Sequence, residues 1–349
     1  MTEFGIFNVM QQRHRAKPSA QVFREAVDQV RVAEELGFAE IWFVEHHASN
    51  YSLCPSPLTM AAHCAGFTSR IRLGTAVIVA PLYLPARLLA EIAMVDTLSD
   101  GRLDIGIGTG YQAYEFAKFG VDIANKNEMT YEMLDLIEGG LAHGSVQHEG
   151  THYDIDELAI SVDTIQQPHP PIWLATSDPV LQRRAAAQGH RLFVSGHLGG
   201  VSYLEQQRDA IVQSFADEGI DNEPPLGMLR LAFATHDEAE ARHYADCARY
   251  QQRVAAALKQ RRQRVSDDHM VEEVPFEGEP DLDKMLERMP IGHPEVVAER
   301  ICNEIRAIRP QQIILQPQVG DMSAEASRRS MELWVTDVMP LVEKELSTP

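Results

Sequence analysis

The sequence predicts an α/β fold, a (β/α)8 TIM barrel in which residues 1–349 form a single domain. Three observations lead to this prediction. Short runs of β-branched and aromatic residues alternate with longer amphipathic segments, eight such runs occur along the chain, and 44% of its 349 residues are hydrophobic. Strands that alternate with helices form a parallel sheet, and eight strands are the number that closes a barrel. An open, doubly wound sheet is the competing interpretation.

The first half of the chain supplies four of the expected strands. We expect them at 4–9, 41–44, 71–79 and 103–107. The run at 41–44 is apolar without a break, as in a strand that is buried on both faces. Ser19 is expected to cap a helix that ends at Leu36-Gly37. A further helix is expected at 58–67, and Pro85 opens another at a position where its missing N–H costs nothing.

The second half of the chain repeats this alternation more loosely. Strands are expected at 172–175, 192–194, 226–235 and 312–316, and helices at 180–188, 201–218, 237–259, 294–308 and 324–346. Two segments break the alternation. Residues 143–167 have no helical period and are expected to form an extended excursion, whereas residues 261–289 are acidic and poor in aromatic side chains. Loops this long in a compact domain are either lids or disordered, and we expect 261–289 to be a mobile lid.

Charge and cysteine usage narrow the classes of function. The chain has 51 acidic and 31 basic residues, a net charge of −20, which repels phosphate backbones and anionic lipid and argues against nucleic-acid binding. Its four cysteines show no C-x-x-C spacing, which is typical of reduced thiols in a reducing compartment. Residues 1–10 lack the features of an export signal, and no apolar stretch approaches the roughly 18 residues of a membrane helix. We therefore expect a cytoplasmic protein with no membrane partner.

The segment Glu45-His46-His47 is the first candidate for chemistry. It follows the second expected strand directly, and the active sites of such barrels lie at the carboxyl ends of the strands. A histidine at that position can hydrogen-bond to a bound intermediate or exchange a proton with it near neutral pH, and Glu45 can orient it or pair elsewhere. A packed or exposed histidine pair is the structural alternative. No metal is expected, because adjacent histidines point in different directions and no third ligand is placed to join them.

The glycine-rich turn from Gly106 to Tyr111 is the second candidate. Glycines after a strand let the backbone approach a phosphate or a planar ring closely, which makes Gly108, Thr109, Gly110 and Tyr111 candidate ligand contacts. The spacing is G-x-G-x-G, so the turn is not a dinucleotide-binding fingerprint. A tight barrel turn without a ligand is the structural alternative.

The third candidate is Thr176-Ser177-Asp178-Pro179, between the fifth expected strand and its helix. Hydroxyl groups and free N–H groups at a helix start form an anion site. Asp178 argues against a bare phosphate and can instead cap the helix, with Pro179 at the first helical position. Taken alone, the segment favours simple capping.

Taken together, these motifs resemble those of the bacterial luciferase-like flavin monooxygenases over nearly the full length of the chain. The matching motifs are, in order, Phe4-Gly5-x-Phe7, Glu34-x-Leu36-Gly37-Phe38, Ile41-Trp42-x-x-Glu45-His46-His47, Gly74-Thr75-Ala76-Val77-Ile78-Val79, Pro85 with Arg87, Asp96-x-Leu98-Ser99-x-Gly101-Arg102, Gly106-x-Gly108-x-Gly110-Tyr111, Glu115-Phe116 with Phe119-Gly120, Pro171-Ile172-Trp173 before Ser177, Gly292-x-Pro294-Glu295, and Asp337-Val338-Met339-Pro340. No single motif is specific to the family, and the ordered series carries the resemblance.

The resemblance implies a reaction and its participants. FMN would bind at the top of the barrel in its reduced form, FMNH2, delivered by a separate flavin reductase. A C4a-hydroperoxyflavin would then insert one oxygen atom from O2 into a small apolar organic substrate. The resemblance also implies a homodimer, because members of the family are commonly dimers.

Individual residues also acquire expected roles from the resemblance. His46 matches the active-site histidine of the family and is expected to face the flavin, while Glu45 and His47 organise the strand end or a subunit contact. Ala76-Val77 matches a non-proline cis peptide beneath the flavin ring. The segment 261–289 matches a mobile active-site loop, which suits a reaction from which water must be kept out.

The chain also departs from the luciferase pattern. Gly108-Thr109 stands where luciferase has Cys-Arg, so an arginine for the flavin phosphate is missing. The phosphate would rely on Ser177, on backbone N–H groups and on another basic side chain. Ser177-Asp178 replaces a Glu-Ser pair. Light emission from a long-chain aldehyde is therefore not carried over.

The substrate pocket is expected at the barrel mouth. Its expected lining is Phe7, Trp42, Tyr111 and Trp173, of which Trp173 could equally be core. Two alternatives to the monooxygenase stay open: a deazaflavin-dependent oxidoreductase that transfers hydride, and a non-catalytic subunit that binds flavin beside an active homologue. Retention of Glu45-His46-His47 argues against the non-catalytic subunit.

Overall fold

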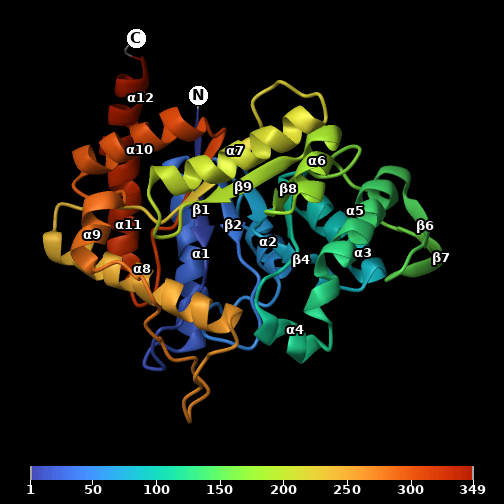
Figure 1. Ribbon diagram of the computed structural model, residues 1–349, viewed down its shortest axis with the longest axis horizontal. Helices are drawn as coiled ribbons and strands as arrows, with labels where there is room; N and C mark the ends of the chain where they lie inside the picture. Colours follow the sequence, from blue (N-terminus) through green and yellow to red (C-terminus); the bar gives the residue numbers. More distant parts are fainter. Residues whose placement is uncertain (1, 348–349) are drawn as a thin grey trace.

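The computed structural model describes residues 2–347 and contains a closed barrel of parallel strands surrounded by helices (Figure 1). The barrel strands are β1 (Glu3–Asn8), β2 (Glu40–Phe43), β3 (Arg72–Thr75), β4 (Ile78–Val79), β5 (Leu103–Gly108), β8 (Ile172–Ala175), β9 (Arg191–Ser195), β10 (Leu226–Arg230) and β13 (Gln312–Leu315). Their order, β3-β2-β1-β13-β10-β9-β8-β5, is closed by pairing of β3 with β5, and β4 continues the position of β3 beside β5. The predicted eight-position barrel is confirmed, and the open sheet is wrong.

The helices lie between successive strands and cover the outside of the barrel. They are α1 (Ser19–Leu36), α2 (Pro57–Ala65), α3 (Pro85–Leu98), α4 (Ala113–Phe119), α5 (Lys126–His143), α6 (Pro179–Gln188), α7 (Val201–Asp217), α8 (Glu238–Lys259), α9 (Leu282–Arg288), α10 (Pro294–Ile308), α11 (Ala324–Leu333) and α12 (Met339–Ser347). In α1 the apolar residues Val22, Ala26 and Val30 are buried, because they repeat at helical spacing on one face. Gly37, with φ 83°, ends this helix as expected. Within residues 2–347, none of the helices combines the length and the apolar character needed to cross a bilayer.

Several boundaries differ from the prediction for local reasons. Ser19 is the first helical residue and not the cap, since Pro18 holds the extended conformation before the helix and makes no side-chain cap bond. The strand expected at 226–235 ends at Arg230. Phe233–Ala234 (β11) leaves the barrel and pairs with Ile291–Gly292 (β12).

Two helices that follow the glycine turn, α4 and α5, are absent from the sequence prediction. The helix expected at 324–346 is interrupted by a wider π turn at Trp334–Val338. These differences leave the barrel unchanged and alter only its outer layer.

The two irregular segments behave differently from one another. The expected excursion is confirmed, because a hairpin of β6 (Ser145–Glu149) and β7 (Asp154–Ala159) extends from the barrel at the edge of the molecule (Figure 1). The expected lid is only partly irregular. Residues 260–281 contain no helix, and a single bridge joins Val265 to Val271. The remainder of the expected lid is α9, whose Met285 is buried, so this part is a packed helix and not a loop.

An aromatic cluster fills the middle of the barrel. The Trp42 ring meets the rings of Trp173 and Phe193 edge-on, with centroids 5.0 Å from each. Gly74 makes this possible, because a Cβ atom there would lie 2.2 Å from the Trp42 ring. The indole N–H of Trp42 donates to Gln312 Oε1 at 3.0 Å, which satisfies its one polar group. The cluster closes the barrel interior beneath its carboxyl rim.

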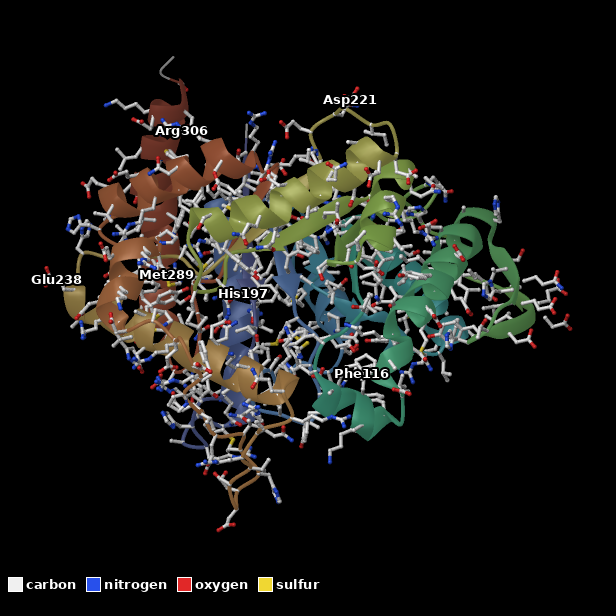
Figure 2. All side chains as sticks on the ribbon, in the orientation of Figure 1. Phe116, His197, Asp221, Glu238, Met289 and Arg306 are labelled. Atoms are coloured by element: carbon white, nitrogen blue, oxygen red, sulfur yellow. The ribbon has the colours of Figure 1, made fainter. Side chains whose placement is uncertain are left out.

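A second buried cluster lies beside the barrel, beneath α8 and α9. Its members include Leu231, Phe233, Tyr244, Cys247, Ala248, Met285, Met289, Val319 and Met322. Met289, a member of this cluster, is fully buried, whereas Asp221 and Arg306 lie at the outer edge of the molecule (Figure 2). The cluster fixes α8 against the loop that follows β13.

Candidate active site

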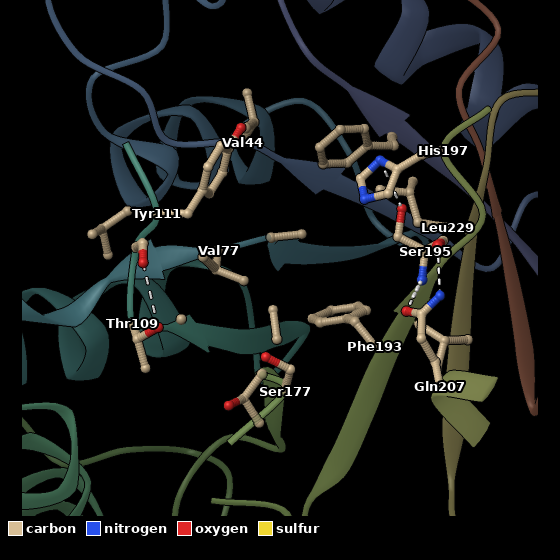
Figure 3. A pocket seen from close by; sticks show the side chains of 18 of the residues that line it. Val44, Val77, Thr109, Tyr111, Ser177, Phe193, Ser195, His197, Gln207 and Leu229 are labelled. Carbon is tan, nitrogen blue, oxygen red and sulfur yellow. Dashed lines mark hydrogen bonds between the residues drawn. The ribbon is translucent and has the colours of Figure 1, made fainter. Parts of the chain in front are cut away.

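A cavity of about 710 Å³ lies at the carboxyl ends of the barrel strands, and residues of α7 and α8 also line it. Figure 3 shows part of its lining, including Val77, Thr109, Ser177 and Phe193. Most of the predicted site residues line it: Phe7, His46, Ala76, Val77, Gly108, Thr109, Gly110, Tyr111 and Ser177. Asp178, Trp42 and Trp173 are not among the lining residues. All of the lining strands are parallel, so their ends converge on this one rim.

Trp42 and Trp173 lie below the cavity and not in its wall. Their side chains point into the barrel and are 0% and 2% exposed. Phe193, which stacks on Trp173 with centroids 5.1 Å apart, is the member of this cluster that reaches the cavity. The prediction that Trp42 and Trp173 line the cavity is therefore wrong. Both side chains point inward from short strands, which buries them one layer below the cavity.

His46 occupies a restrained position in the cavity wall. Its Nδ1 atom lies 2.9 Å from Oε1 of Glu115, a side chain that is 1% exposed. The same carboxylate oxygen accepts the backbone N–H of His47 at 2.7 Å. The His46 ring also meets Tyr51 edge-on, with centroids 4.6 Å apart. Among residues 2–347 no partner contacts Nε2 of His46, so this nitrogen is free for a bound molecule.

Glu45 and His47 form a separate pair that holds the strand end. His47 Nε2 lies 2.8 Å from Glu45 Oε1, and Glu45 Oε2 accepts the backbone N–H of Val79 at 3.1 Å and the Tyr83 hydroxyl at 2.9 Å. Burial, together with the nearby Glu45 charge, raises the pKa of Tyr83 well above its ordinary value. The two histidines therefore bond to different carboxylates and point apart, which agrees with the organising role expected for Glu45 and His47.

The cis peptide and the glycine turn lie next to each other in the cavity wall. The Ala76-Val77 peptide is cis, which confirms that prediction. A Cβ atom at Gly108 would lie 2.5 Å from Cγ2 of Val77, so only glycine fits beside this peptide. Gly110 has φ 73°, and a Cβ atom there would lie 2.6 Å from the Phe116 ring. The glycines therefore let the turn pack closely on Val77 and Phe116, and both glycines remain part of the cavity lining.

Two lysines supply positive charge at the same end of the cavity. Lys126 donates to the carbonyl of Gly110 at 2.8 Å and lies 3.4 Å from the Thr109 hydroxyl. Burial, followed by the charge of Lys259, lowers the pKa of Lys126. Both lysines line the cavity, and neither forms an ion pair with a carboxylate of residues 2–347. Unpaired cations inside a chain of net charge −20 indicate a site for an anion.

The turn before α6 both caps that helix and contributes to the cavity lining. Asp178 caps the helix by accepting the N–H of Val180 at 3.0 Å, and it also accepts the Tyr131 hydroxyl. Burial and the bond to Asp178 raise the pKa of Tyr131 to about 12. Ser177 lines the cavity beside Thr176. Both interpretations of this segment therefore apply, the cap to Asp178 and the cavity contact to Ser177.

The wall formed by β9 and α7 is polar. Gln207 donates to the Ser195 carbonyl at 2.9 Å and accepts its N–H at 3.1 Å (Figure 3). His197 lines the cavity but is exposed, and its Nδ1 lies 3.4 Å from the Ser195 hydroxyl. Desolvation by the surrounding walls, then the charges of Arg230 and Lys259, lower the pKa of His197, so its ring is neutral at neutral pH. These groups form a polar strip in a cavity whose lining is mostly apolar.

Several side chains of this site are missing from the sequence prediction of site residues, among them Glu115, Lys126, His197 and Lys259. Glu115 appeared only as part of a matching motif, with no role. Lys126 is the first residue of α5, a helix that was not predicted. The helix dipole disfavours a lysine at this position. Had α5 been predicted, this unfavourable placement would have pointed to Lys126. His197 carries no pattern of its own.

Comparisons with known proteins extend these observations. The family model described as luciferase-like monooxygenase matches residues 2–310. An uncharacterized protein of Sinorhizobium fredii, y4vJ, is 43% identical over 345 residues and covers 99% of this chain and 98% of its own length. The oxygenase component of flavin-dependent trigonelline monooxygenase from Acinetobacter baylyi is 31% identical over 243 residues, which cover 68% of this chain and 66% of that protein.

Solved structures show the same architecture. The monooxygenase RslO1 of Streptomyces bottropensis superposes with a TM-score of 0.84 at 25% identity, covering 97% of this chain and 99% of that one. The oxygenating constituent of 3,6-diketocamphane monooxygenase from Pseudomonas putida, in complex with FMN, has a TM-score of 0.79 at 18% identity and covers 97% and 98%. An F420-dependent secondary alcohol dehydrogenase has a TM-score of 0.73 at 15% identity and covers 98% and 99%. The last two likenesses concern the fold alone.

Proposed function

Because the chain belongs to the luciferase-like monooxygenase family, we propose that it is the oxygenase of a two-component system that uses reduced FMN and O2. One oxygen atom enters a small organic substrate and the other leaves as water, with two electrons and two protons supplied by the reduced flavin. One observation carries this proposal. A single cavity is lined by a restrained histidine, by the glycine turn beside the cis peptide, and by two lysines that have no carboxylate partner among residues 2–347.

The residues of the cavity fit FMN. Bound reduced FMN would supply the electrons that activate O2. Lys126 and Lys259, with the Ser177 hydroxyl, would hold its phosphate in place of the arginine that luciferase has. The Ala76-Val77 peptide and the glycine turn would lie beneath the ring system. The two lysines would then be the other basic side chains that the phosphate requires.

His46 is the candidate catalytic residue. Glu115 fixes its ring through Nδ1, which leaves Nε2 directed to a bound molecule. A histidine held in this way can donate or accept one proton as charge develops on the reacting atoms. A carboxylate partner also stabilises the protonated ring, so the pair can hold a proton between steps. The retained pair argues against a non-catalytic subunit.

The substrate side of the cavity lies between Phe193, Tyr111 and the polar wall at Ser195 and Gln207. Aromatic rings on one side and amide and hydroxyl groups on the other suit a molecule with an apolar body and one polar group. Neutral His197 adds one more hydrogen-bonding nitrogen to this wall. The proposed substrate is therefore a small amphiphilic molecule and not a plain hydrocarbon.

The proposal includes two partners. The reaction requires a separate flavin reductase to supply the reduced FMN, and the family resemblance implies that a second copy of this chain would form a homodimer. Size-exclusion chromatography with light scattering tests the second expectation against the 39.0 kDa mass of the single chain. A mass equal to one chain at micromolar concentration would remove the homodimer from the proposal.

The experiment that tests the function compares cofactors and then products. Anaerobic titrations with reduced FMN and with a reduced deazaflavin show which of the two cofactors binds. When air is admitted, only the FMN-bound enzyme would consume O2. A reductase, FMN and isotopically labelled O2 are then combined with a panel of aldehydes, ketones, terpenes and heterocyclic carboxylates. Label in a product supports the monooxygenase, whereas tight binding of the deazaflavin alone would replace it with a hydride-transfer enzyme.

His46→Ala tests the catalytic role directly. We expect the rate of oxygenated product to fall about 100-fold, the size expected when a positioned acid–base group is removed, while flavin binding persists. The control is His63→Ala, which removes an exposed histidine of α2 outside the cavity. Product formation by His46→Ala at the wild-type rate would end the assignment.

A further inference from the structure

A cluster of possible metal ligands lies outside the cavity, between α8 and the loops at the carboxyl rim. His243 and Cys247 are one helical turn apart on α8, and Asp321 follows β13. His14, in the loop after β1, faces the other oxygen of Asp321. None of these side chains lines the cavity, and the proposed reaction uses none of them.

The distances between the ligand atoms match a tetrahedral site. Cys247 Sγ lies 3.8 Å from His243 Nε2 and 3.1 Å from Asp321 Oδ1, and His243 Nε2 lies 3.8 Å from the same oxygen. Metal–ligand bonds of roughly 2.0 to 2.3 Å at tetrahedral angles place neighbouring ligand atoms about 3.3 to 3.8 Å apart. The His14 Nε2 atom lies 3.8 Å from Asp321 Oδ2, within reach of a fourth position. The three nearest ligands therefore need little movement to share an ion.

The surrounding structure holds this arrangement in place. Gly320 has φ 58°, and a Cβ atom there would lie 3.1 Å from Cys247 Sγ, so the loop packs directly on the thiol. Val319 and Met322, on either side of Asp321, are each 1% exposed in the cluster beneath α8. The N–H of Gly320 donates to Gln11 Oε1 at 2.8 Å. The loop that carries Asp321 is therefore packed against α8 and is not a free surface loop.

Among residues 2–347, Arg13 competes for these ligands. Its guanidinium group donates to Asp321 Oδ1 at 3.2 Å and lies 3.8 Å from Cys247 Sγ. It also pairs with Asp246 at 2.8 Å and with Glu273 at 2.9 Å, and these two carboxylates pair in turn with Arg249 and Arg253. A bound cation would therefore have to displace the guanidinium from Asp321 Oδ1, while Asp246 and Glu273 keep Arg13 in the protein. The positive charge nearby weakens the site without removing any ligand.

We propose that His243, Cys247 and Asp321 bind a zinc-class divalent cation, with His14 as the fourth ligand. Mixed sulfur, nitrogen and oxygen ligands select zinc or cobalt over magnesium and calcium, which prefer oxygen alone. The thiol proton passes to solvent as the sulfur–metal bond forms, so no redox partner is required. A bound ion would tie α8 to the loops after β1 and β13, at the base of the segment 260–281.

Cobalt titration of the intact protein tests this site. Co²⁺ bound to a thiolate gives a near-ultraviolet charge-transfer band, and a sample loaded with Zn²⁺ serves as the blank so that any flavin absorption cancels. We expect this band in the wild type at one equivalent, its loss in Cys247→Ser, and at least about tenfold weaker binding in His243→Gln and Asp321→Asn. We also expect Zn²⁺, but not Mg²⁺, to displace the cobalt.

The controls separate this site from other ligands of the chain. His236 and His293 form an exposed pair, 3.2 Å apart, whose double change to glutamine should leave the band unchanged. His14→Gln should weaken binding less than His243→Gln, because His14 is the most distant of the four. Absence of the band in the wild type, or a band that survives in Cys247→Ser, would overturn the proposal. Circular dichroism of each variant shows whether the fold is retained.

Discussion

Glu115 holds two neighbouring residues of one strand end at the same time. Its carboxylate is bonded to the His46 ring and to the backbone N–H of His47, and only 1% of the residue is exposed. A buried carboxylate with two bonds to one oxygen acts as a fixed acceptor, which sets the orientation of the ring. His46 could be predicted from its place after a strand. Glu115 could not, because 69 positions separate it from His46 and only the closed barrel brings the two together.

Replacing Glu115 by glutamine tests this orienting role. The amide keeps the shape but removes the charge that steadies the imidazole, so we expect kcat to fall about tenfold with little change in KM. A shift in the pH profile of kcat should accompany the loss, which a purely structural defect would not produce. Glu128→Gln is the matched control, since it removes an exposed glutamate that is paired with His152. An unchanged profile in Glu115→Gln would show that the carboxylate does not act through His46.

Lys126 carries a second prediction at the scale of single residues. If it binds the flavin phosphate, Lys126→Gln should weaken the binding of FMN about tenfold and leave that of riboflavin, which lacks the phosphate, unchanged. Fluorescence titration with both ligands measures the two affinities. Lys118→Gln, which removes the lysine over the Tyr114 ring, is the control. Equal weakening for the two flavins would assign Lys126 to the structure of the turn and not to the phosphate.

At the scale of elements, the sequence predicted the barrel strands better than the layer around them. Alternating apolar runs define strands such as β8 without knowledge of the rest of the chain. The short helix α4 was not predicted because it buries only Glu115 and Phe116, and so has no apolar stripe to recognise. Helix α5 does carry such a stripe, since Met133, Ile137 and Leu141 are buried at helical spacing, so its pattern was present in the sequence and was missed. Strand β10 ends early because the following residues pair with β12, a partner that lies far along the chain. Long-range pairing of this kind has no local signal.

The segment 260–281 is attached to the barrel more firmly than a free loop. Asn50, 4% exposed, accepts the N–H of Val271 at 2.7 Å and donates to its carbonyl at 3.2 Å. Val271 is itself buried in a small cluster with Tyr51 and Tyr250. We still propose that the segment acts as a lid, and the bonds to Asn50 are then the contacts that opening must break.

Asn50→Ala should release this lid without unfolding the protein. Because the buried backbone of Val271 loses both of its bonds, we expect trypsin to cut after the arginines at 261–264 about tenfold faster. The melting temperature should change little, since the barrel core is untouched. Asn222→Ala, an exposed change in the loop before β10, is the control. Wild-type cleavage rates in Asn50→Ala would show that other contacts hold the segment.

The whole molecule carries an excess of negative charge, and some of its partly buried carboxylates are held by cations. Glu138 joins Arg184 at 2.8 Å and His190 at 2.8 Å between α5 and α6. Burial alone would raise the pKa of Glu138, but the bonds from His190 and Arg184 outweigh it and lower the pKa to about 2. A pKa below that of the unfolded chain means that ionised Glu138 stabilises the fold. This stability is fully present above about pH 5 and is lost as the pH falls toward 2.

Glu138→Gln tests this contribution to global stability. At pH 7 we expect the free energy of unfolding to fall by about 2 kcal/mol, a value reduced for solvent screening of the partly exposed arginine. The difference from the wild type should shrink as the pH is lowered from 5 toward 3, because the wild type then loses the same charge. Urea denaturation at several pH values measures both curves. A difference that is constant across this range would assign the loss to packing and not to the charge.

The glycine turn and Glu115 belong to one short stretch of chain, and this has a consequence for binding. Gly110 and Glu115 are separated by five positions, and Gly110 packs on Phe116, the neighbour of Glu115. A ligand that orders the turn therefore also orders the helix that steadies His46. The coupling works in both directions: ligand binding at the glycine turn favours the ordered helix that orients His46, and the ordered helix favours ligand binding to the same degree. The empty enzyme and the loaded enzyme would then differ in catalytic competence before any substrate arrives.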